Sequence, residues 1–182
     1  GMSIGPMCRV GGEVEESIIQ GYSNKYHDGF LGHAYVGEWV NLGALTTNSD
    51  LKNDYSSVSV VLDGKAPIDT GSTKVGSIIG DHTKTSIGTL LNTGSFVGAM
   101  ALLLATGKPL PKHIPSFAWF IEGVVSKGFG KGKLYETAKT AMSRRKMQWT
   151  AADEAMWDAV FDQTAEARDA AVKKGRKQLL RK

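Results

Sequence analysis

The segment IGDHTKTSIGTLLNTGSFV, residues 79–97, repeats its pattern every six residues and decides the fold. Apolar or β-branched side chains stand at positions 79, 85, 91 and 97, and the segment VGEWVNLG, residues 36–43, takes the same step once. A period of six fits neither a helix, with a period of about 3.6, nor an alternating strand, with a period of 2. It fits short straight strands joined by corners, where a small residue lets the backbone bend. Three six-residue faces form one coil of a parallel β-helix, which buries its core by stacking coils.

The repeat is interrupted between residues 49 and 73. Inside this interruption, residues 58–62 (VSVVL) predict a strand, Asp63-Gly64 is a turn signal and residues 69–73 form a polar loop. We interpret the segment as a loop that leaves the solenoid and returns to it. The first predicted domain is therefore a β-helix over residues 3–107 that carries an inserted loop at 49–73. Long insertions in regular scaffolds often carry functional sites.

The composition changes after Gly107, where three prolines (Pro109, Pro111 and Pro115) are expected to end the repeats. The second predicted domain covers residues 108–182. It is expected to begin as extended chain lying across a surface, followed by a flexible glycine-lysine loop at 126–133 and two helices. The first helix covers roughly residues 133–147. The second begins at Thr150, whose spacing from Asp153 predicts a variant of the capping box, and its apolar stripe is expected at Met156, Val160, Phe161, Thr164 and Ala167. The expected fold class is mainly β with C-terminal α-helices.

The composition indicates in which cellular compartment the protein is expected. No apolar run approaches the roughly 18 residues of a membrane-spanning helix, so no membrane partner is expected. Cys8 is the single cysteine, which excludes an internal disulfide and a cysteine-cluster metal site. This cysteine usage suits a cytoplasmic protein.

The net charge of +4 is unevenly distributed. The last ten residues, KKGRKQLLRK, hold six of the 22 basic residues and no acidic one, so the remaining chain carries 16 basic against 18 acidic residues. With a net charge of −2, the body is not expected to bind nucleic acid. The basic tail is read as a solvated helix end, with an anionic partner as the alternative.

Three familiar kinds of site are excluded by spacing. The segment SKGFGKGK at 126–133 lacks the spacing of a phosphate-binding P-loop and its Ser or Thr after Lys. The glycine pairs do not follow a strand and open a helix, as a dinucleotide site would require. The four histidines (His27, His33, His82 and His113) lack a pairwise metal-ligand spacing, so no metal is expected.

His27 is the candidate catalytic residue, within the segment NKYHDGFLG. A histidine can act as a general base near neutral pH. Lys25 stands two residues earlier and therefore on the same side of an extended segment, which makes it a candidate for substrate binding. The alternative is that His27 is a structural hydrogen-bonding residue beside Asp28.

Several long motifs accompany His27, namely GYSNK-x-HDGFLG, GEW-x-NLGA, N-x-DLKN-x-Y, GDH-x-K, LNTG, PSFAW and M-x-RRK. Over roughly residues 4–150 they resemble the C-terminal acyltransferase domain of the bifunctional UDP-N-acetylglucosamine pyrophosphorylase/glucosamine-1-phosphate N-acetyltransferases, in a variant branch. The resemblance implies a left-handed parallel β-helix that forms homotrimers with sites at subunit junctions. It further implies acetyl-CoA as co-substrate, an amino-sugar phosphate such as glucosamine-1-phosphate as acceptor, and a place in UDP-N-acetylglucosamine biosynthesis.

The resemblance also assigns residues. His27 matches the family's catalytic histidine, which takes a proton from the substrate amine as it attacks the acetyl thioester. Asn41 matches an asparagine of the sugar site or one supporting the histidine, Asn48 matches an asparagine at the end of a T-x-N stretch, and Lys74 matches a lysine that contacts the substrate phosphate. The resemblance leaves the residues that bind acetyl-CoA unassigned.

Two positions depart from the family pattern and favour an alternative. Phe30 replaces an expected phenol, and Glu15 replaces an expected lysine, so an anionic sugar would be repelled there. The family's N-terminal nucleotidyltransferase domain is not in this sequence, so this chain is expected to make no sugar nucleotide. The alternative hypothesis is a non-catalytic trimerisation or regulatory module of a sugar-1-phosphate nucleotidyltransferase. A third is an acyltransferase that acts on another amine or hydroxyl.

Overall fold

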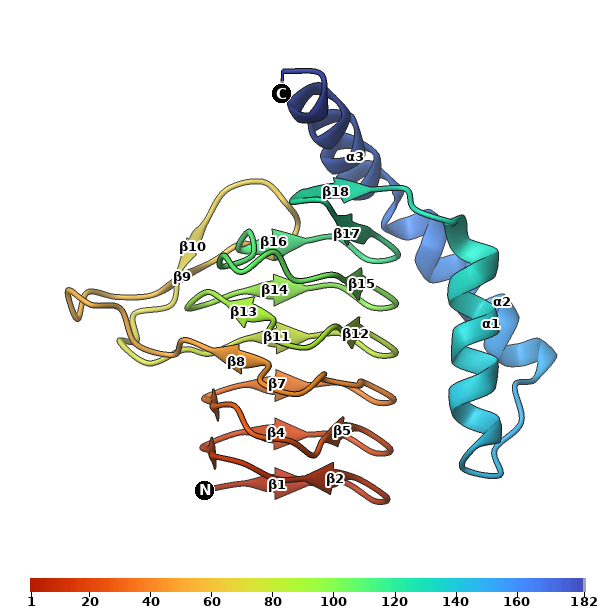
Figure 1. The fold of residues 1–182 in the computed structure, drawn as a ribbon, viewed down its shortest axis with the longest axis horizontal. Helices are drawn as coiled ribbons and strands as arrows, with labels where there is room; N and C mark the ends of the chain where they lie inside the picture. The colour runs from red at the N-terminus through yellow and green to blue at the C-terminus, as the bar shows by residue number, and fades with distance from the viewer. Residues whose placement is uncertain (182) are drawn as a thin grey trace.

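The computed structural model describes residues 1–181 and shows a parallel β-solenoid followed by three helices (Figure 1). The coils stack from the N-terminus upward, and the helices lie along one side and over the last coil (Figure 1). The predicted fold class, a mainly β parallel β-helix with C-terminal helices, is confirmed.

Each coil contributes short strands to three faces. Face 1 contains the parallel strands β1 (Ser3–Ile4), β4 (Ile18–Ile19), β7 (Tyr35–Val36), β11 (Ile78–Ile79), β14 (Phe96–Val97) and β16 (His113–Ile114). Face 2 contains β2 (Arg9–Val10), β5 (Asn24–Lys25), β12 (Lys84–Thr85), β15 (Leu102–Leu103) and β17 (Trp119–Ile121), with Asn41 bridging β5 and β12. Face 3 contains β3 (Val14–Glu15), β6 (Leu31–Gly32), β8 (Thr47–Asn48) and β13 (Leu90–Leu91).

The six-residue register is confirmed at residues 79–97. Ile79, Thr85, Leu91 and Val97 occupy the second position of β11, β12, β13 and β14, and all four side chains are buried. The same inward position recurs one step later at Leu103. Burying one such aliphatic side chain contributes roughly 1.5–3 kcal/mol, so the narrow core inside the coils carries most of the stability.

One corner of the solenoid has an unusual backbone. Between faces 1 and 2, each coil places a non-glycine residue in the left-handed region, with φ between 54° and 61°: Met7, Tyr22, Trp39, His82, Met100 and Phe117. A left-handed L-residue costs roughly 1–2 kcal/mol. Stacking of the corner side chains offsets this cost, because the Tyr22 and Trp39 ring centroids lie 4.2 Å apart with nearly parallel planes. We call these six residues the aromatic corner, because four of them carry aromatic rings.

The chain leaves the solenoid after Asp50 and returns at Val75, whose N–H donates to the Asp50 carbonyl at 2.9 Å. Between them, β9 (Ser59–Val60) and β10 (Ile68–Asp69) form an antiparallel hairpin, so the strand expected within residues 58–62 is present. The coils close over this gap, because β7 pairs directly with β11. The inserted segment therefore projects from the solenoid without disturbing its stacking (Figure 1).

The expectation that the prolines end the repeats is wrong. β16 pairs in parallel with β14, and β17 pairs in parallel with β15. The proline rings are tolerated because the inward positions of this coil keep the pattern, with Ile114 and Phe120 buried. The parallel ladder ends when β18 (Val124–Ser126) turns back antiparallel to β17.

Three helices follow instead of the two expected: α1 (Gly130–Ser143), α2 (Ala151–Gln163) and α3 (Ala165–Leu179). The predicted capping box at Thr150 and Asp153 is present. The predicted second helix is divided at Thr164, whose hydroxyl donates to the Val160 carbonyl and so closes α2.

The helices pack on the aromatic corner through a second apolar cluster that includes Phe117, Leu134, Tyr135 and Trp157. The apolar stripe expected on the second helix is wrong at its first position, because Met156 is exposed and the neighbouring Trp157 is buried. Within the described residues, no helix is long and apolar enough to cross a lipid bilayer.

Candidate functional site

His27 lies in the corner between β5 and β6, where faces 2 and 3 meet. Its side chain is exposed and forms no hydrogen bond with any described residue, Asp28 included. The corner itself is fixed. The Leu45 N–H of the next coil donates to the Asp28 carbonyl at 2.8 Å, and a Cβ on Gly29 would lie 2.2 Å from the Thr46 carbonyl oxygen. A rigid corner thus presents a free imidazole to solvent.

Lys25 lies inside the solenoid, with 3% of its surface exposed. In face 2 it pairs in register with Val10, so its side chain occupies an inward position. The Lys25 ammonium donates to the carbonyls of Gly11 and His27, and burial lowers its pKa while Asp28 opposes that shift. This placement makes Lys25 a positioning residue for the backbone that carries His27 rather than an open ligand for substrate.

Asn48 is also buried, and its side-chain oxygen and nitrogen each form a hydrogen bond. Its Oδ1 accepts from the Gly32 N–H and its Nδ2 donates to the Gly32 carbonyl, each at 2.9 Å. One side chain therefore joins β6 to β8 in face 3. Both of its polar groups are used by the backbone.

Asn41 and Lys74 are exposed but lie on different parts of the solenoid. Asn41 stands on face 2, where its Oδ1 accepts from the Nδ2 of Asn24 at 2.8 Å. Lys74 stands at the neck of the inserted loop, bridged to Leu51. The five residues proposed from the sequence are thus divided among the interior, face 2 and two corners, and one chain alone does not bring them together.

A histidine–carboxylate pair that sequence reasoning missed lies at the other end of β6. The Nδ1 of His33 and the Oδ2 of Asp50 are 2.7 Å apart, with 23% and 12% of the side chains exposed. A carboxylate on Nδ1 orients the imidazole and leaves Nε2 as the free nitrogen. The two residues are 17 positions apart, close to one coil, and that spacing is the signal that could have revealed them. Six residues separate His27 from His33, a reach of at most about 20 Å.

Lys74 lies in the chain segment that returns beside His33, because the N–H of Gly76, two residues after Lys74, donates to the His33 carbonyl at 2.9 Å. The pKa of the exposed Glu16 carboxyl is lowered mainly by its hydrogen bond with the amino-terminal group, and Lys74 lowers it further. This corner between faces 3 and 1 therefore collects both signs of charge. Among residues 1–181, no group of three or more His, Cys, Asp or Glu side chains is arranged to hold a metal ion.

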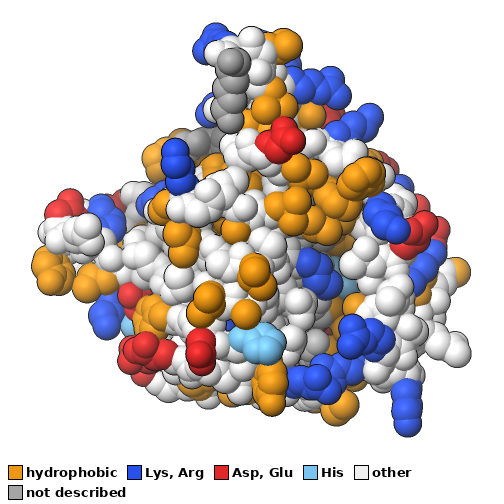
Figure 2. Space-filling view, in the orientation of Figure 1, with side chains coloured by type: hydrophobic (Ala, Val, Ile, Leu, Met, Phe, Trp, Pro, Cys, Tyr) orange, Lys and Arg blue, Asp and Glu red, His pale blue; other side chains and the backbone are white. Residues whose placement is uncertain are grey.

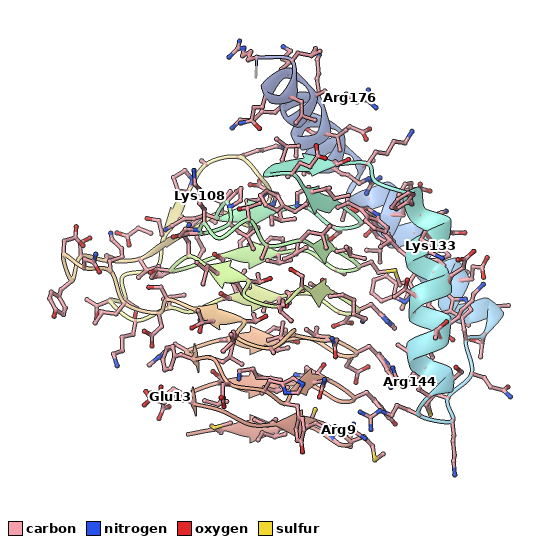
Figure 3. All side chains as sticks on the ribbon, viewed as in Figure 1. Arg9, Glu13, Lys108, Lys133, Arg144 and Arg176 are labelled. Carbon is pink, nitrogen blue, oxygen red and sulfur yellow. The ribbon has the colours of Figure 1, made fainter. Side chains whose placement is uncertain are left out.

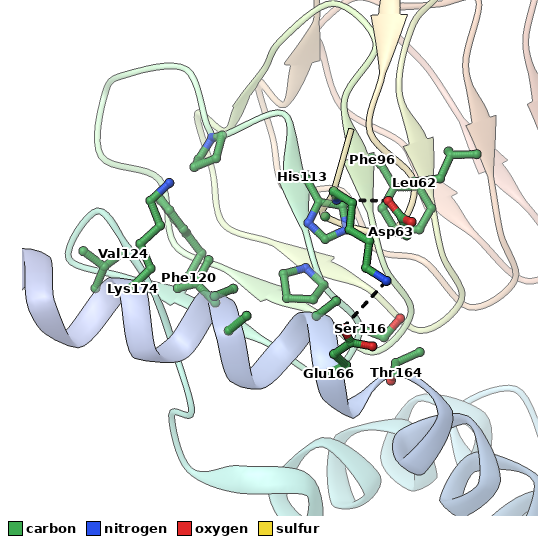
Figure 4. A pocket seen from close by; sticks show the side chains of 18 of the residues that line it. Leu62, Asp63, Phe96, His113, Ser116, Phe120, Val124, Thr164, Glu166 and Lys174 are labelled. Carbon is green, nitrogen blue, oxygen red and sulfur yellow. Dashed lines mark hydrogen bonds and ion pairs between the residues drawn. The ribbon is translucent and has the colours of Figure 1, made fainter. Parts of the chain in front are cut away.

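A cavity of about 710 Å³ lies between the inserted loop, the last coil and α3 (Figure 4). His113 stacks on Phe96 with ring centroids 5.4 Å apart, and burial lowers the His113 pKa against the opposing effects of Leu62 and Asp63. Lys65 of the inserted loop forms an ion pair with Glu166 of α3 at 3.7 Å (Figure 4). None of the residues proposed from the sequence lines this cavity.

Comparison with curated proteins identifies relatives over part of the chain, although no family model matches. A bifunctional sugar-1-phosphate nucleotidylyltransferase/acetyltransferase of Sulfurisphaera tokodaii is 37% identical over 89 residues, 49% of this chain and 22% of the relative. The bifunctional protein GlmU of Synechococcus elongatus is 29% identical over 120 residues, 64% of this chain and 22% of the relative. GlmU of Rippkaea orientalis is 45% identical over 51 residues, 26% of this chain and 11% of the relative.

The chain spans about a fifth of the length of the first two of these relatives. Its parallel solenoid agrees with the β-helix that the motifs of residues 4–150 led us to expect. The predicted resemblance is therefore confirmed: this chain is a relative, over part of their length, of the bifunctional sugar-1-phosphate nucleotidylyltransferase/acetyltransferases.

Proposed function

We propose that this chain is an acetyl-CoA-dependent N-acetyltransferase domain that acts on an amino-sugar phosphate, with His27 as the general base. The observation that carries the proposal is the free, exposed imidazole on a rigid corner. The names of the relatives, which include acetyltransferases, support the reaction class.

The chemistry needs one base at the attacking amine. The neutral imidazole of His27 takes a proton as the amine nitrogen attacks the thioester carbonyl carbon of acetyl-CoA. A carbon–nitrogen bond forms, the carbon–sulfur bond breaks, and the proton passes to the departing thiolate, so that the products are an amide and free CoA. Backbone N–H groups at the corners would stabilise the oxyanion that forms on the carbonyl oxygen.

The sugar-binding part of the site would be completed by a second subunit. Among residues 1–181 no carboxylate orients the His27 imidazole, and Lys74, proposed for the substrate phosphate, lies at a different corner. Packing of parallel solenoids in a homotrimer would bring one chain's face 3 against a neighbour's corner. The mass in solution, from light scattering, tests this assembly.

The His33–Asp50 pair is a second candidate for the base. It has the carboxylate partner that His27 lacks, and its imidazole is still 23% exposed. The proposed reaction is unchanged if this pair supplies the base. The two histidines are separable by single substitutions because they lie at opposite ends of β6.

The test is release of free thiol from acetyl-CoA in the presence of glucosamine-1-phosphate. His27→Ala should lower kcat by on the order of 10²–10⁴, while His33→Ala should leave it within a few-fold. The reverse result would move the base to the His33–Asp50 pair. Equal rates for both variants and the parent would overturn both His27 and His33 as the base.

Calorimetry distinguishes an acetyltransferase from a non-catalytic module. The enzyme should bind CoA or glucosamine-1-phosphate even when His27 is replaced, since the base is not needed for binding. A stable trimer that binds neither compound would instead favour a trimerisation or regulatory role. A different acceptor would show as CoA binding without turnover of glucosamine-1-phosphate.

A further inference from the structure

A basic groove runs between face 2 of the solenoid and the C-terminal end of α1. Its wall contains four cationic side chains: Arg9 and Lys84 from the solenoid, and Arg144 and Arg145 from the residues that follow α1. Arg9 and Arg144 lie on opposite sides of it (Figure 3), and blue side chains gather where the lower coils meet α1 (Figure 2). We propose that this groove binds the phosphate groups of a small polyphosphate, such as the diphosphate of a nucleotide.

The four cations have no internal counter-ion. Within residues 1–181 none of them forms an ion pair, and no carboxylate lines the smaller part of the groove. The adjoining part contains Glu136, but this carboxylate is already paired with Lys133 at 2.9 Å. Like charges held together repel one another, and an anion between them removes the repulsion. The uncompensated positive charge of the groove thus favours binding of a multiply charged anion.

Lys84 is held in a fixed position for such an anion. Its Nζ donates to the Trp39 carbonyl at 2.6 Å and to the His82 carbonyl at 2.9 Å. An ammonium has three donors, so one N–H remains for a ligand. Burial lowers the pKa of Lys84 to about 8, so the side chain is still largely protonated at neutral pH. Its charge is desolvated, which strengthens its attraction for an anion.

A second polar group in the groove is unsatisfied. The Nδ2 of Asn24 donates to Asn41, but the Oδ1 of Asn24 is buried and accepts no hydrogen bond from any described residue. An acceptor needs a donor, which an ionised phosphate oxygen does not supply. A hydroxyl next to the phosphates would supply it, so a nucleotide or another hydroxyl-bearing phosphate ester fits this part of the groove.

The dimensions agree with this chemistry. The part lined by the four cations has a volume of about 180 Å³, equal to roughly six water molecules at about 30 Å³ each. That space suits a diphosphate and excludes an attached nucleoside. A second hollow of about 420 Å³ shares Asn41, Lys84, Ala141 and Arg144 with the first, so a nucleoside could extend into it.

The helix dipole does not account for the cluster. The C-terminal end of α1 carries partial negative charge, which favours Arg144 and Arg145 there. It gives no reason for Arg9 and Lys84, which come from β2 and β12 at different heights of the solenoid. The convergence of two elements on one groove is the feature that points to a ligand.

The site is independent of the acetyl transfer proposed above. Asn41 is the one residue shared with the set proposed for the sugar substrate, and His27 does not line the groove. Binding to the groove should therefore survive the substitution His27→Ala. Loss of acetyltransferase activity and loss of polyphosphate binding are then separate results.

Isothermal titration of the full chain with inorganic pyrophosphate and with ADP tests the proposal. The double variant Arg144→Ala/Arg145→Ala and the single variant Arg9→Ala should each weaken binding by about tenfold or more, since each removes charged hydrogen bonds. Lys108→Ala is the matched control, because this exposed lysine removes the same charge away from the groove. Circular dichroism of each variant checks that the fold is intact.

Two outcomes support the proposal and two overturn it. ADP binding more tightly than pyrophosphate supports a nucleotide that also uses Asn24, and equal binding supports recognition of the diphosphate alone. Absence of heat with both compounds at millimolar concentration overturns the site. Unchanged affinity in the Arg9 and Arg144/Arg145 variants also overturns it, because the anion would then bind elsewhere.

Discussion

The rings of Trp39 and His82 stack with centroids 6.0 Å apart and planes 8° apart, although the inserted loop separates them in the chain. Trp157 from α2 meets the edge of the same imidazole at 5.6 Å. His82 is therefore enclosed by the rings of Trp39 from the preceding coil, Trp149 from the segment before α2, and Trp157 from α2. Desolvation in this enclosure, helped by the charge of Lys84 and opposed by Asp153, lowers the pKa of His82 to about 3.

The first prediction is that His82 makes the fold sensitive to mild acid. In the unfolded chain the pKa of a histidine is about 6.5. Below that pH the unfolded state therefore binds a proton at this residue, whereas the folded state does not until the pH is much lower. Stability is unaffected by this group above pH 6.5 and falls as the pH drops from there towards 3, by up to about 1.4 kcal/mol per pH unit. Urea denaturation at several pH values between 7.5 and 4.5 measures the slope.

The control for this slope is His82→Asn. Asparagine tolerates the left-handed backbone at this corner and does not titrate in that range. Other groups, including His113 and the carboxylates, contribute equally to parent and variant, so the difference in slope belongs to His82. Identical slopes would show that His82 is not held neutral.

The second prediction concerns Lys25. Replacing it with Met keeps the length of the side chain but leaves the carbonyls of Gly11 and His27 without their donor. A buried acceptor that loses its partner costs about 1–3 kcal/mol, partly offset because a desolvated charge is also removed. We expect a lower urea midpoint together with a lower kcat, because the His27 corner loses its support. Lys108→Met, at an exposed site, should change neither quantity.

The third prediction separates the two asparagines. Asn48→Ala removes both hydrogen bonds to the Gly32 backbone inside the solenoid and should destabilise the fold by about 1–3 kcal/mol. Asn41→Ala changes an exposed side chain and should stay within about 0.5 kcal/mol. Thermal or urea denaturation of the two variants side by side checks the contrast. A stable Asn48→Ala protein would contradict the structural role given to Asn48.

The fourth prediction concerns the contact of α3 with β18. A Cβ on Gly175 would lie 2.2 Å from the Val125 carbonyl oxygen, so Gly175→Ala should push the helix off the strand at a cost of roughly 1–3 kcal/mol. Gly132 in α1 has open space around it, and Gly132→Ala should be neutral or stabilise by up to about 1 kcal/mol through helix propensity. Hydrogen exchange of the α3 amides reports the local effect. Equal protection in both variants would argue against close packing at Gly175.

Much of the fold could be predicted because each face of a solenoid repeats the same six-residue pattern in the sequence. The inward residues of the register at 79–97 are apolar or β-branched, and these are the positions that the structure buries. The insertion could be predicted because the six-residue repeat is lost between residues 49 and 73. The last coil was missed because its prolines weigh heavily in local propensity, whereas the tertiary stacking of Ile114 and Phe120 decides the outcome.

The site was harder to predict because side-chain direction depends on register. Lys25 pairs with Val10 in the parallel ladder, so its charged side chain lies inside the solenoid, although we expected it to face the substrate. The His33–Asp50 pair depends on two coils meeting, and neither residue suggests it alone. The basic groove depends on where α1 ends against the solenoid, and no local pattern in the sequence encodes that contact.

The neck of the inserted loop has a consequence for how such a protein can change. The hydrogen bond between Val75 and Asp50 and the bridge between Leu51 and Lys74 close the neck, and β7 pairs directly with β11 across the insertion. Lengthening a loop costs little, since closure entropy grows only with the logarithm of its length. A different segment grafted at this junction would rebuild one wall of the cavity, provided that it also replaces Val58 and Val60, whose side chains are buried in the present structure.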